Sequence, residues 1–218
     1  FAWPSSAVVS KKKEALFNLG YGLTYKSNNQ IALLSENSGL IISGVASNDN
    51  YFSKGVSVSP WNLWLVSGEL VKQVVSFPIS VGGLMVSKTD HLAQEDALRI
   101  YWKRGDKTRY QASNEDNYFR ISSIEPDDIT RQSNGAMKLA FYAKSFAGSK
   151  EIIRIGQCDN QIDCDKTVKL EISNDWKKYF ISLKDFENLG IKMSNITSVF
   201  LVKAIAGTDI GISDIHLE

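Results

Sequence analysis

The histidines and carboxylates of this chain offer little to a catalytic site. Only two histidines occur, His91 in a polar turn and His216 in an expected strand, so a serine or cysteine triad has little to build on. The carboxylate pairs at 95–96 and 127–128 are adjacent in sequence, and neighbours in a strand point to opposite faces. Neither pair would place an acid and a base before one substrate. We therefore expect no catalytic residues here.

Aromatic side chains and arginine are the residue types most suited to binding a ligand. Aromatic rings stack on the apolar faces of sugars, while arginines and amides bond the surrounding hydroxyl groups. In one expected strand Leu98, Ile100 and Trp102 share a face, so Trp102 should be buried. Arg99 and Tyr101 share the other face, which looks either to solvent or to a ligand. The candidate carbohydrate-binding residues are Tyr51, Phe52, Arg99, Tyr101, Tyr110 and Trp176.

The two cysteines lie close together in a polar segment. Cys158 and Cys164 bound the run Cys-Asp-Asn-Gln-Ile-Asp-Cys, which is short enough for a disulfide to close. Two cysteines with no nearby histidine make a poor zinc site, and free thiols are the remaining alternative. A disulfide would favour an oxidising compartment, so we expect a periplasmic or secreted protein.

Acidic residues near the end of the chain suggest a calcium site. Asp209, Asp214 and Glu218 could supply oxygen ligands together with Asp49 or Glu36. Plain surface carboxylates are the simpler explanation of the same residues. Calcium is the only cofactor that the sequence suggests.

Composition excludes two classes of partner. Hydrophobic residues make up 43% and charged residues 22% of the 218 residues, and no apolar run approaches the length of about 20 residues that a membrane span needs. The 25 basic and 24 acidic residues are mixed along the chain and give a net charge of +1. Nothing supplies the basic field that nucleic-acid binding uses. We expect neither a membrane nor a nucleic acid as partner.

Short alternating or β-branched runs separated by Gly, Asn, Asp and Ser predict an all-β fold. Their number and spacing indicate two packed antiparallel sheets, a β-sandwich of the jelly-roll kind. Helical turns are expected at 127–131 and 184–189, and a long polar loop at 45–61. The expected strands are 31–34, 40–45, 63–66, 74–81, 83–88, 97–103, 108–112, 118–121, 137–143, 152–155, 167–172, 178–183, 199–204 and 210–217.

Two motifs near the start of the chain resemble a known family. Leu-Phe-Asn-Leu-Gly-Tyr-Gly-Leu-Thr-Tyr at 16–25 resembles the Phe-Gly-Tyr-Gly-Leu-Ser-Tyr signature that closes the second domain of glycoside hydrolase family 3 enzymes. Phe-Ala-Trp-Pro at 1–4 resembles the Phe-Ser-Trp-Pro that precedes that signature. The resemblance implies that residues 1–27 are the C-terminal remnant of a catalytic α/β domain with a linker.

Later motifs resemble the appended domain of the same enzymes. Gln-Glu-Asp-Ala-Leu-Arg-Ile-Tyr-Trp at 94–102 and Arg-Gln-Ser-Asn-Gly-Ala-Met-Lys-Leu at 131–139 are similar to the C-terminal galactose-binding-like domain of bacterial family 3 exo-β-glucan hydrolases. The pattern at 176–186 is shared more loosely by many carbohydrate-binding modules. Relatives often carry Cys-Gly-x-x-Cys-Gly, whereas this chain has the wider, glycine-free spacing.

This resemblance implies a galactose-binding-like β-sandwich over 28–218 in a retaining β-glucosidase or exo-β-glucanase. The nucleophilic aspartate and the acid/base glutamate would lie in preceding domains, so the chain itself should release no glucose. One hypothesis is an accessory domain of carbohydrate-binding-module type that contacts β-glucan beside the catalytic domains of the same polypeptide. The alternative is a structural domain that binds no sugar, stabilises the catalytic domains and lends the loop 45–61 to the active-site entrance.

Overall fold

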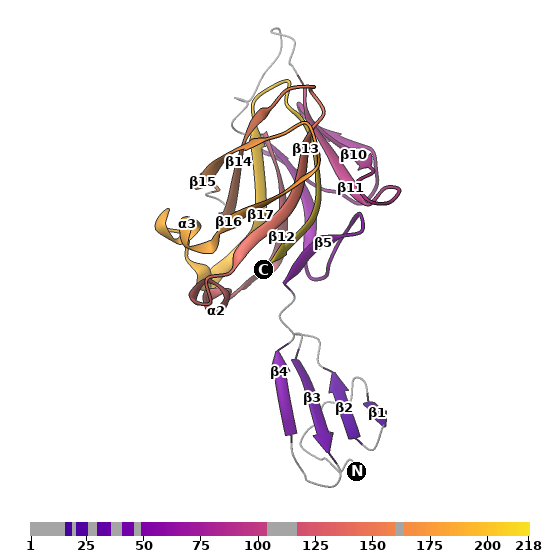
Figure 1. Ribbon diagram of the computed structural model, residues 1–218, viewed down its shortest axis with the longest axis vertical. Coiled ribbons are helices and arrows are strands. Elements are labelled where there is room, and N and C mark those ends of the chain that lie inside the picture. The colour runs from indigo at the N-terminus through magenta and orange to yellow at the C-terminus, as the bar shows by residue number, and fades with distance from the viewer. Residues whose placement is uncertain are drawn as a thin grey trace. The chain divides into compact units, whose positions relative to one another are not determined.

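Glycines, prolines and short polar residues divide the chain into many brief strands, and the computed structural model arranges these as antiparallel sheets (Figure 1). The structure describes residues 16–18, 21–25, 30–35 and 41–45 as backbone only, and residues 49–103, 117–159 and 164–218 with their side chains. The chain forms two compact units, 1–48 and 49–218. Within the described residues, no helix is long and apolar enough to cross a membrane.

The first unit contains a four-stranded antiparallel sheet in sequence order. Its strands are β1 (Leu16–Asn18), β2 (Tyr21–Tyr25), β3 (Gln30–Ser35) and β4 (Ile41–Val45). The 28–218 sandwich that we expected would have included β3 and β4, but these strands pair within the first unit. That residues 1–27 end a preceding catalytic domain stays a prediction.

One layer of the second unit is an eight-stranded sheet, referred to below as the front sheet. Its main path runs β16-β13-β18-β11-β10-β9, and β5 pairs with both β18 and β6. The strands are β5 (Asn50–Ser53), β6 (Val56–Ser57), β9 (Ile79–Val81), β10 (Leu84–Thr89), β11 (Ala97–Trp102), β13 (Lys138–Ser145), β16 (Lys177–Ser182) and β18 (Asp209–Leu217).

The other layer is a six-stranded sheet, referred to below as the back sheet, with the order β15-β14-β17-β12-β7-β8. Its strands are β7 (Asn62–Ser67), β8 (Leu70–Gln73), β12 (Asn117–Asp127), β14 (Glu151–Cys158), β15 (Thr167–Ile172) and β17 (Ile196–Ala204). The short helices α2 (Thr130–Asn134) and α3 (Leu183–Asn188) lie together at one end of the sandwich (Figure 1), joined by the Ser133–Glu187 hydrogen bond. The 3₁₀ turn η2 is Met193–Asn195.

The core lies between the two sheets, where alternate residues of both point inward. Phe141 of β13 contacts Phe200 of β17 edge to face at 5.3 Å between ring centroids, which joins the layers. Trp102 is buried, as its alternation with Arg99 and Tyr101 predicted, and its indole N–H donates to the Asn117 carbonyl at 2.9 Å. The prediction of an all-β antiparallel sandwich is confirmed.

Three local predictions differ from the structure. Within the expected loop 45–61, residues 50–57 form the β5–β6 hairpin, in which Phe52 pairs with Ile215 of the last strand. The expected strand 74–81 is reduced to β9 at its end. The helical turn expected at 127–131 begins only at Thr130, because β12 continues to Asp127. The expected strand 108–112 lies outside the described residues.

Candidate functional site

The outer face of the front sheet gathers the side chains that the sequence singled out. Because inward and outward residues alternate, Arg99 and Tyr101 of β11 point away from the core. The strand register places Arg99 opposite Gly211 and Tyr101 opposite Asp209 on β18. Gly211 in turn faces Lys144 of β13. Three strands therefore meet at Gly211, the one position among them that lacks a side chain.

Trp176 reaches this face from the turn between β15 and β16. Ser173, Asn174 and Asp175 are residue types that favour turns, because their side chains bond nearby backbone groups. The Ser173 hydroxyl donates to the Asp175 carbonyl at 2.9 Å, and the Asn174 amide donates to the Gly148 carbonyl at 3.3 Å. The Ser173 amide also donates to the Tyr179 hydroxyl. These bonds fix the turn from which the indole projects.

The indole of Trp176 lies against the backbone of Gly211. A Cβ atom added to Gly211 would be 2.6 Å from the ring of Trp176 and 3.1 Å from that of Phe146. Both rings are half-buried, so each keeps an exposed part. Two aromatic side chains thus approach the backbone of the sheet closely at Gly211. We refer to Arg99, Tyr142, Phe146, Trp176 and Gly211 as the Trp176 patch.

Arg99 supplies the polar edge of the Trp176 patch. Its Nε and Nη2 atoms donate to the two carboxylate oxygens of Asp209 at 2.9 and 2.6 Å, a bidentate pair. The hydrogen bond with Asp209 raises the pKa of the Arg99 guanidinium. The guanidinium carbon also lies 4.6 Å from the centroid of the Phe146 ring. Arg99 is therefore held in one orientation while its side chain remains 45% exposed.

The turn that contains His91 packs against two aromatic residues of the Trp176 patch, Tyr142 and Trp176. The imidazole of His91 lies 4.5 Å from the ring of Trp176 and 4.6 Å from that of Tyr142. The carboxylate of Asp96 accepts hydrogen bonds from the backbone amides of residues 91, 92 and 93 at 2.7 to 3.0 Å. Burial raises the pKa of the Asp96 carboxyl, but these three amide donors outweigh it and hold the pKa below its usual value.

The Asp96→Asn variant should therefore be less stable at neutral pH. A carboxyl group whose pKa is lowered by folding stabilises the protein above its unfolded-state pKa of about 3.9, and this contribution is lost as the pH falls through the folded-state value. We expect a loss of about 1–2 kcal/mol at pH 7, since charge-assisted hydrogen bonds become neutral ones. Urea unfolding of both proteins at pH 7 and pH 3 measures it. A difference that does not shrink at pH 3 would contradict the assignment.

The structure does not bring all the predicted carbohydrate-binding residues together. Arg99, Tyr101 and Trp176 are on the outer face of the front sheet. Tyr51 and Phe52 are 1% and 0% exposed in the core, so neither can stack on a sugar as we expected. Burial also raises the pKa of the Tyr51 hydroxyl. Tyr110 lies outside the described residues.

The predicted calcium ligands are engaged elsewhere. Asp209 binds Arg99, and Asp214 accepts hydrogen bonds from the hydroxyls of Ser53 and Ser213, each at 3.3 Å. In the ranges 49–103, 117–159 and 164–218, no three acidic, histidine or cysteine side chains are grouped so that they could hold a metal ion. The described residues thus contain no calcium site of the kind that we expected from Asp209 and Asp214.

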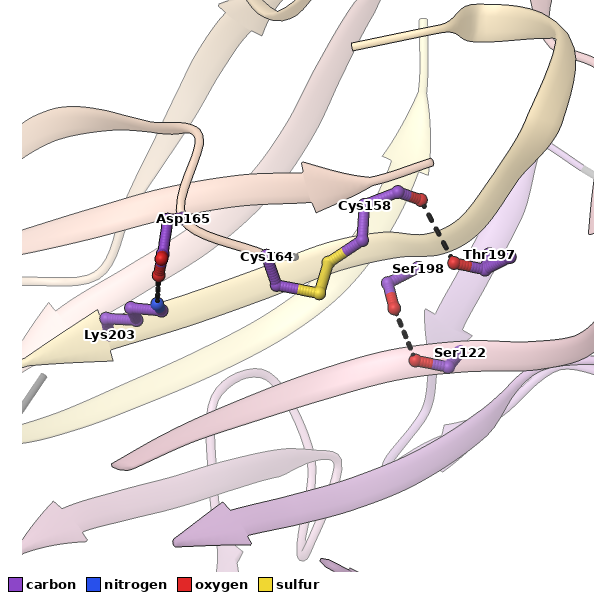
Figure 2. Close-up of a disulfide and its surroundings, with 7 residues drawn as sticks. All are labelled: Ser122, Cys158, Cys164, Asp165, Thr197, Ser198 and Lys203. Carbon is purple, nitrogen blue, oxygen red and sulfur yellow. Dashed lines mark hydrogen bonds and ion pairs between the residues drawn. A yellow bond between two sulfur atoms is a disulfide. The ribbon is translucent and has the colours of Figure 1, made fainter. Parts of the chain in front are cut away.

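Cys158 and Cys164 form a disulfide on the outer face of the back sheet (Figure 2). Both cysteines are buried against Leu201 of β17, and Tyr118 of β12 packs on the same cluster. The Thr197 hydroxyl donates to the Cys158 carbonyl at 3.2 Å. The disulfide therefore fastens the segment that follows β14 to the surface of the sheet.

The aromatic residues Tyr142 and Phe146 were not among the sequence-based candidates. Tyr142 occupies an outward position of β13, opposite Ser213, and Phe146 follows the end of that strand. A signal for this site was available, because a glycine inside a β-branched strand such as Gly211 often marks a close approach by another group. The partners that approach it are far away in sequence and could not be read from that signal.

Comparison with known proteins places the second unit in a family. The family model Exop_C, described as galactose-binding domain-like, matches residues 59–217. Comparison with curated proteins gives no match. The extra C-terminal domain (X) of an exo-1,3/1,4-β-glucanase (ExoP) from a Pseudoalteromonas species is 11% identical with a TM-score of 0.58, over 78% of this chain and 92% of that domain.

Two further solved structures share the fold. The exo-1,3/1,4-β-glucanase from the same Pseudoalteromonas species is 12% identical with a TM-score of 0.57, and the match spans 85% of this chain but 23% of that enzyme. The family 30 carbohydrate-binding module of a cellulosomal cellulase from Clostridium thermocellum is 18% identical with a TM-score of 0.50, over 78% of this chain and 96% of the module. The match to the family model covers most of the chain, so the protein belongs to the Exop_C family of galactose-binding domain-like proteins.

Proposed function

We propose that this chain is an accessory domain of a glycoside hydrolase and that the Trp176 patch binds a β-glucan. The observation that carries this proposal is the half-buried indole of Trp176 held against Gly211, next to the fixed Arg99–Asp209 pair. An aromatic face beside oriented polar groups suits a sugar ring, which has apolar faces and a hydroxyl-bearing rim. The likeness to a domain of an exo-1,3/1,4-β-glucanase supports a β-glucan as the ligand.

Substitution of Trp176 tests the proposal. Affinity electrophoresis with laminarin and barley β-glucan, and pull-down with cellulose, should show binding of the wild-type chain to at least one of these polymers. Trp176→Ala should weaken that binding by about tenfold or more, because one well-packed aromatic contact can contribute about 1.4 kcal/mol or more. Phe180→Ala is the matched control, since Phe180 is 46% exposed on the same sheet but lies outside the Trp176 patch. Binding by neither wild type nor control, or equal binding by Trp176→Ala, would contradict the proposal.

Gly211→Ala tests the same site without removing an aromatic ring. The added methyl group would overlap the indole of Trp176, so the ring must move away from the sheet. We expect a loss of glucan binding comparable with that of Trp176→Ala, together with a changed tryptophan fluorescence spectrum. Isothermal titration with the bound polymer measures the affinity. If the alanine variant binds as wild type does, the close contact has no part in recognition.

Two other properties belong to the same proposal. We place the protein in an oxidising compartment, periplasmic or extracellular, and the Cys158–Cys164 disulfide supports this. The catalytic domains of a family 3 hydrolase are its proposed neighbours in the polypeptide. If none of the three glycans binds, the alternative of a supporting domain makes its own prediction: deleting it should lower the stability of the complete enzyme. Within the loop 45–61 of that alternative, residues 50–57 form a hairpin of the front sheet.

A further inference from the structure

A buried arginine lies on the outer face of the back sheet, on the opposite side of the sandwich from the Trp176 patch. Phe119 and Ile121 of β12 point into the core, so Arg120 between them points outward. The strand register places Arg120 between Trp64 of β7 and Leu201 of β17. An arginine that is almost fully buried is uncommon and requires an explanation.

Arg120 is 6% exposed, yet its polar atoms are not satisfied. Its Nε and Nη1 atoms are enclosed and have no hydrogen-bond acceptor, and no carboxylate of the described residues forms an ion pair with it. Burial lowers the pKa of the guanidinium, although an arginine remains charged at neutral pH. A buried guanidinium normally binds a carboxylate or another anion. Here the protein provides the donors without the acceptor.

More cations surround Arg120 on the same face. The register aligns Lys169 of β15, Arg154 of β14 and Lys203 of β17 across three neighbouring strands, and Lys203 continues to Tyr118 of β12. Both Lys169 and Arg154 are exposed. The face therefore carries a row of basic side chains that leads to the strand of Arg120, in which Lys203 is paired with Asp165.

Two described carboxylates on this face already have cationic partners. Asp165 binds Lys203, and Figure 2 shows this pair beside the disulfide. Glu171 of β15 binds Lys150. Neither of these two acids is left to neutralise Arg120, so within the described ranges its guanidinium lacks an acceptor, which an external anion could supply.

We propose that the outer face of the back sheet binds an anionic glycan, with Arg120 holding a carboxylate or sulfate group of one sugar. Trp64 is the direct cross-strand neighbour of Arg120 and is only half-buried, so its ring can contact the same sugar. Because Nε and Nη1 are enclosed, the Arg120 side chain or its neighbour Trp64 must shift before the planar guanidinium can present two parallel N–H donors, the geometry that carboxylates and sulfates accept. Lys169, which is exposed on β15, would attract further charged units of the polymer.

The disulfide defines one side of this site. Leu201, the other cross-strand neighbour of Arg120, is completely buried beneath Cys158 and Cys164. A hydrogen bond between the Ser122 and Ser198 hydroxyls at 2.6 Å ties β12 to β17 on the same face (Figure 2). The strand that carries Arg120 is thus tied to β17 beside the disulfide, and Trp64 lies on the other side of Arg120.

Affinity electrophoresis of the whole chain tests this inference with two anionic probes, polygalacturonate and dextran sulfate, at low and high salt. We expect retardation by at least one probe, and the one that binds identifies the group as carboxylate or sulfate. Arg120→Gln should weaken this binding about tenfold, and Arg120→Lys should weaken it less because the charge remains. Arg131→Gln is the matched control, since Arg131 is exposed on helix α2, and its affinity should stay within about twofold of wild type.

Three outcomes would overturn the inference: no retardation by either anionic probe, equal retardation of wild type and Arg120→Gln, or an equal loss in Arg131→Gln, which would indicate attraction by net charge alone. Urea unfolding of each variant shows whether it is folded. Trp64→Ala offers a second route, because it should weaken binding of the anionic polymer while leaving all charges in place. Two further measurements distinguish this site from the proposed β-glucan site: laminarin binding by Arg120→Gln and polygalacturonate binding by Trp176→Ala. Each variant should keep wild-type affinity for the polymer of the other site, so one proposal can be wrong while the other holds.

Discussion

Phe141→Ala is expected to destabilise the sandwich by about 3–5 kcal/mol, a large part of the roughly 5–15 kcal/mol that typically separates a folded domain from its unfolded state. Phe141 is fully buried on β13 of the front sheet, and its ring contacts Phe200 of the back sheet at 5.3 Å and Tyr179 at 6.0 Å. Truncation removes the apolar surface of the ring, leaves a cavity between the layers and breaks both aromatic pairs. Urea unfolding followed by tryptophan fluorescence measures the change in the free energy of unfolding.

Phe180→Ala is the control for this measurement. Phe180 is on β16, paired with β13, but is 46% exposed, and the side chains of Lys138 and Lys178 are placed over its ring. The same chemical change there should cost less than about 1 kcal/mol. If the two variants lose equal stability, Phe141 does not join the layers in the way that its contacts indicate.

The alternation of residue types was sufficient to predict most of the second unit. In Ala97–Trp102 the apolar residues occupy every second position, so the burial of Trp102 and the outward direction of Arg99 followed from the period of a strand. The same reasoning failed at Tyr51 and Phe52, because the polar residues around them suggested a loop. Their burial depends on pairing with β18, at the far end of the chain, which no local pattern contains.

The Trp176 patch could be predicted in part from the sequence, whereas the Arg120 site could not. Trp176 and Arg99 were chosen by residue type, but only the register of β11, β18 and β13 brings them together at Gly211. Arg120 was visible as a charge in an apolar strand and was not singled out. Its significance depends on two non-local facts: its pairing with Trp64 and the absence of a carboxylate partner among the described residues. Distances between strands far apart in sequence cannot be obtained from composition or periodicity.

Arg120→Met should make the protein more stable, by about 1–2 kcal/mol. An enclosed charge without an ion-pair partner in the described part of the chain loses hydration on folding and gains no compensating interaction, and replacing buried ionic groups with apolar ones of similar length often stabilises a protein. Methionine keeps an unbranched stem to pack between Trp64 and Leu201. The measurement is the midpoint of urea unfolding. Arg131→Met, at an exposed position, should change stability by less than about 0.5 kcal/mol.

Substitution of Arg120 by methionine should then raise the stability of the protein and weaken its binding of the anionic polymer. If Arg120 has a structural role, its substitution should make the protein less stable. If Arg120 instead serves to bind a ligand, it destabilises the unliganded protein until the ligand supplies the missing hydrogen-bond acceptor. Adding the anionic polymer should therefore raise the unfolding midpoint of the wild type and leave that of Arg120→Met nearly unchanged, because ligand binding to the folded state stabilises it by mass action. A less stable Arg120→Met would show instead that the guanidinium has favourable contacts within the folded protein, and Arg120 would then be part of the scaffold.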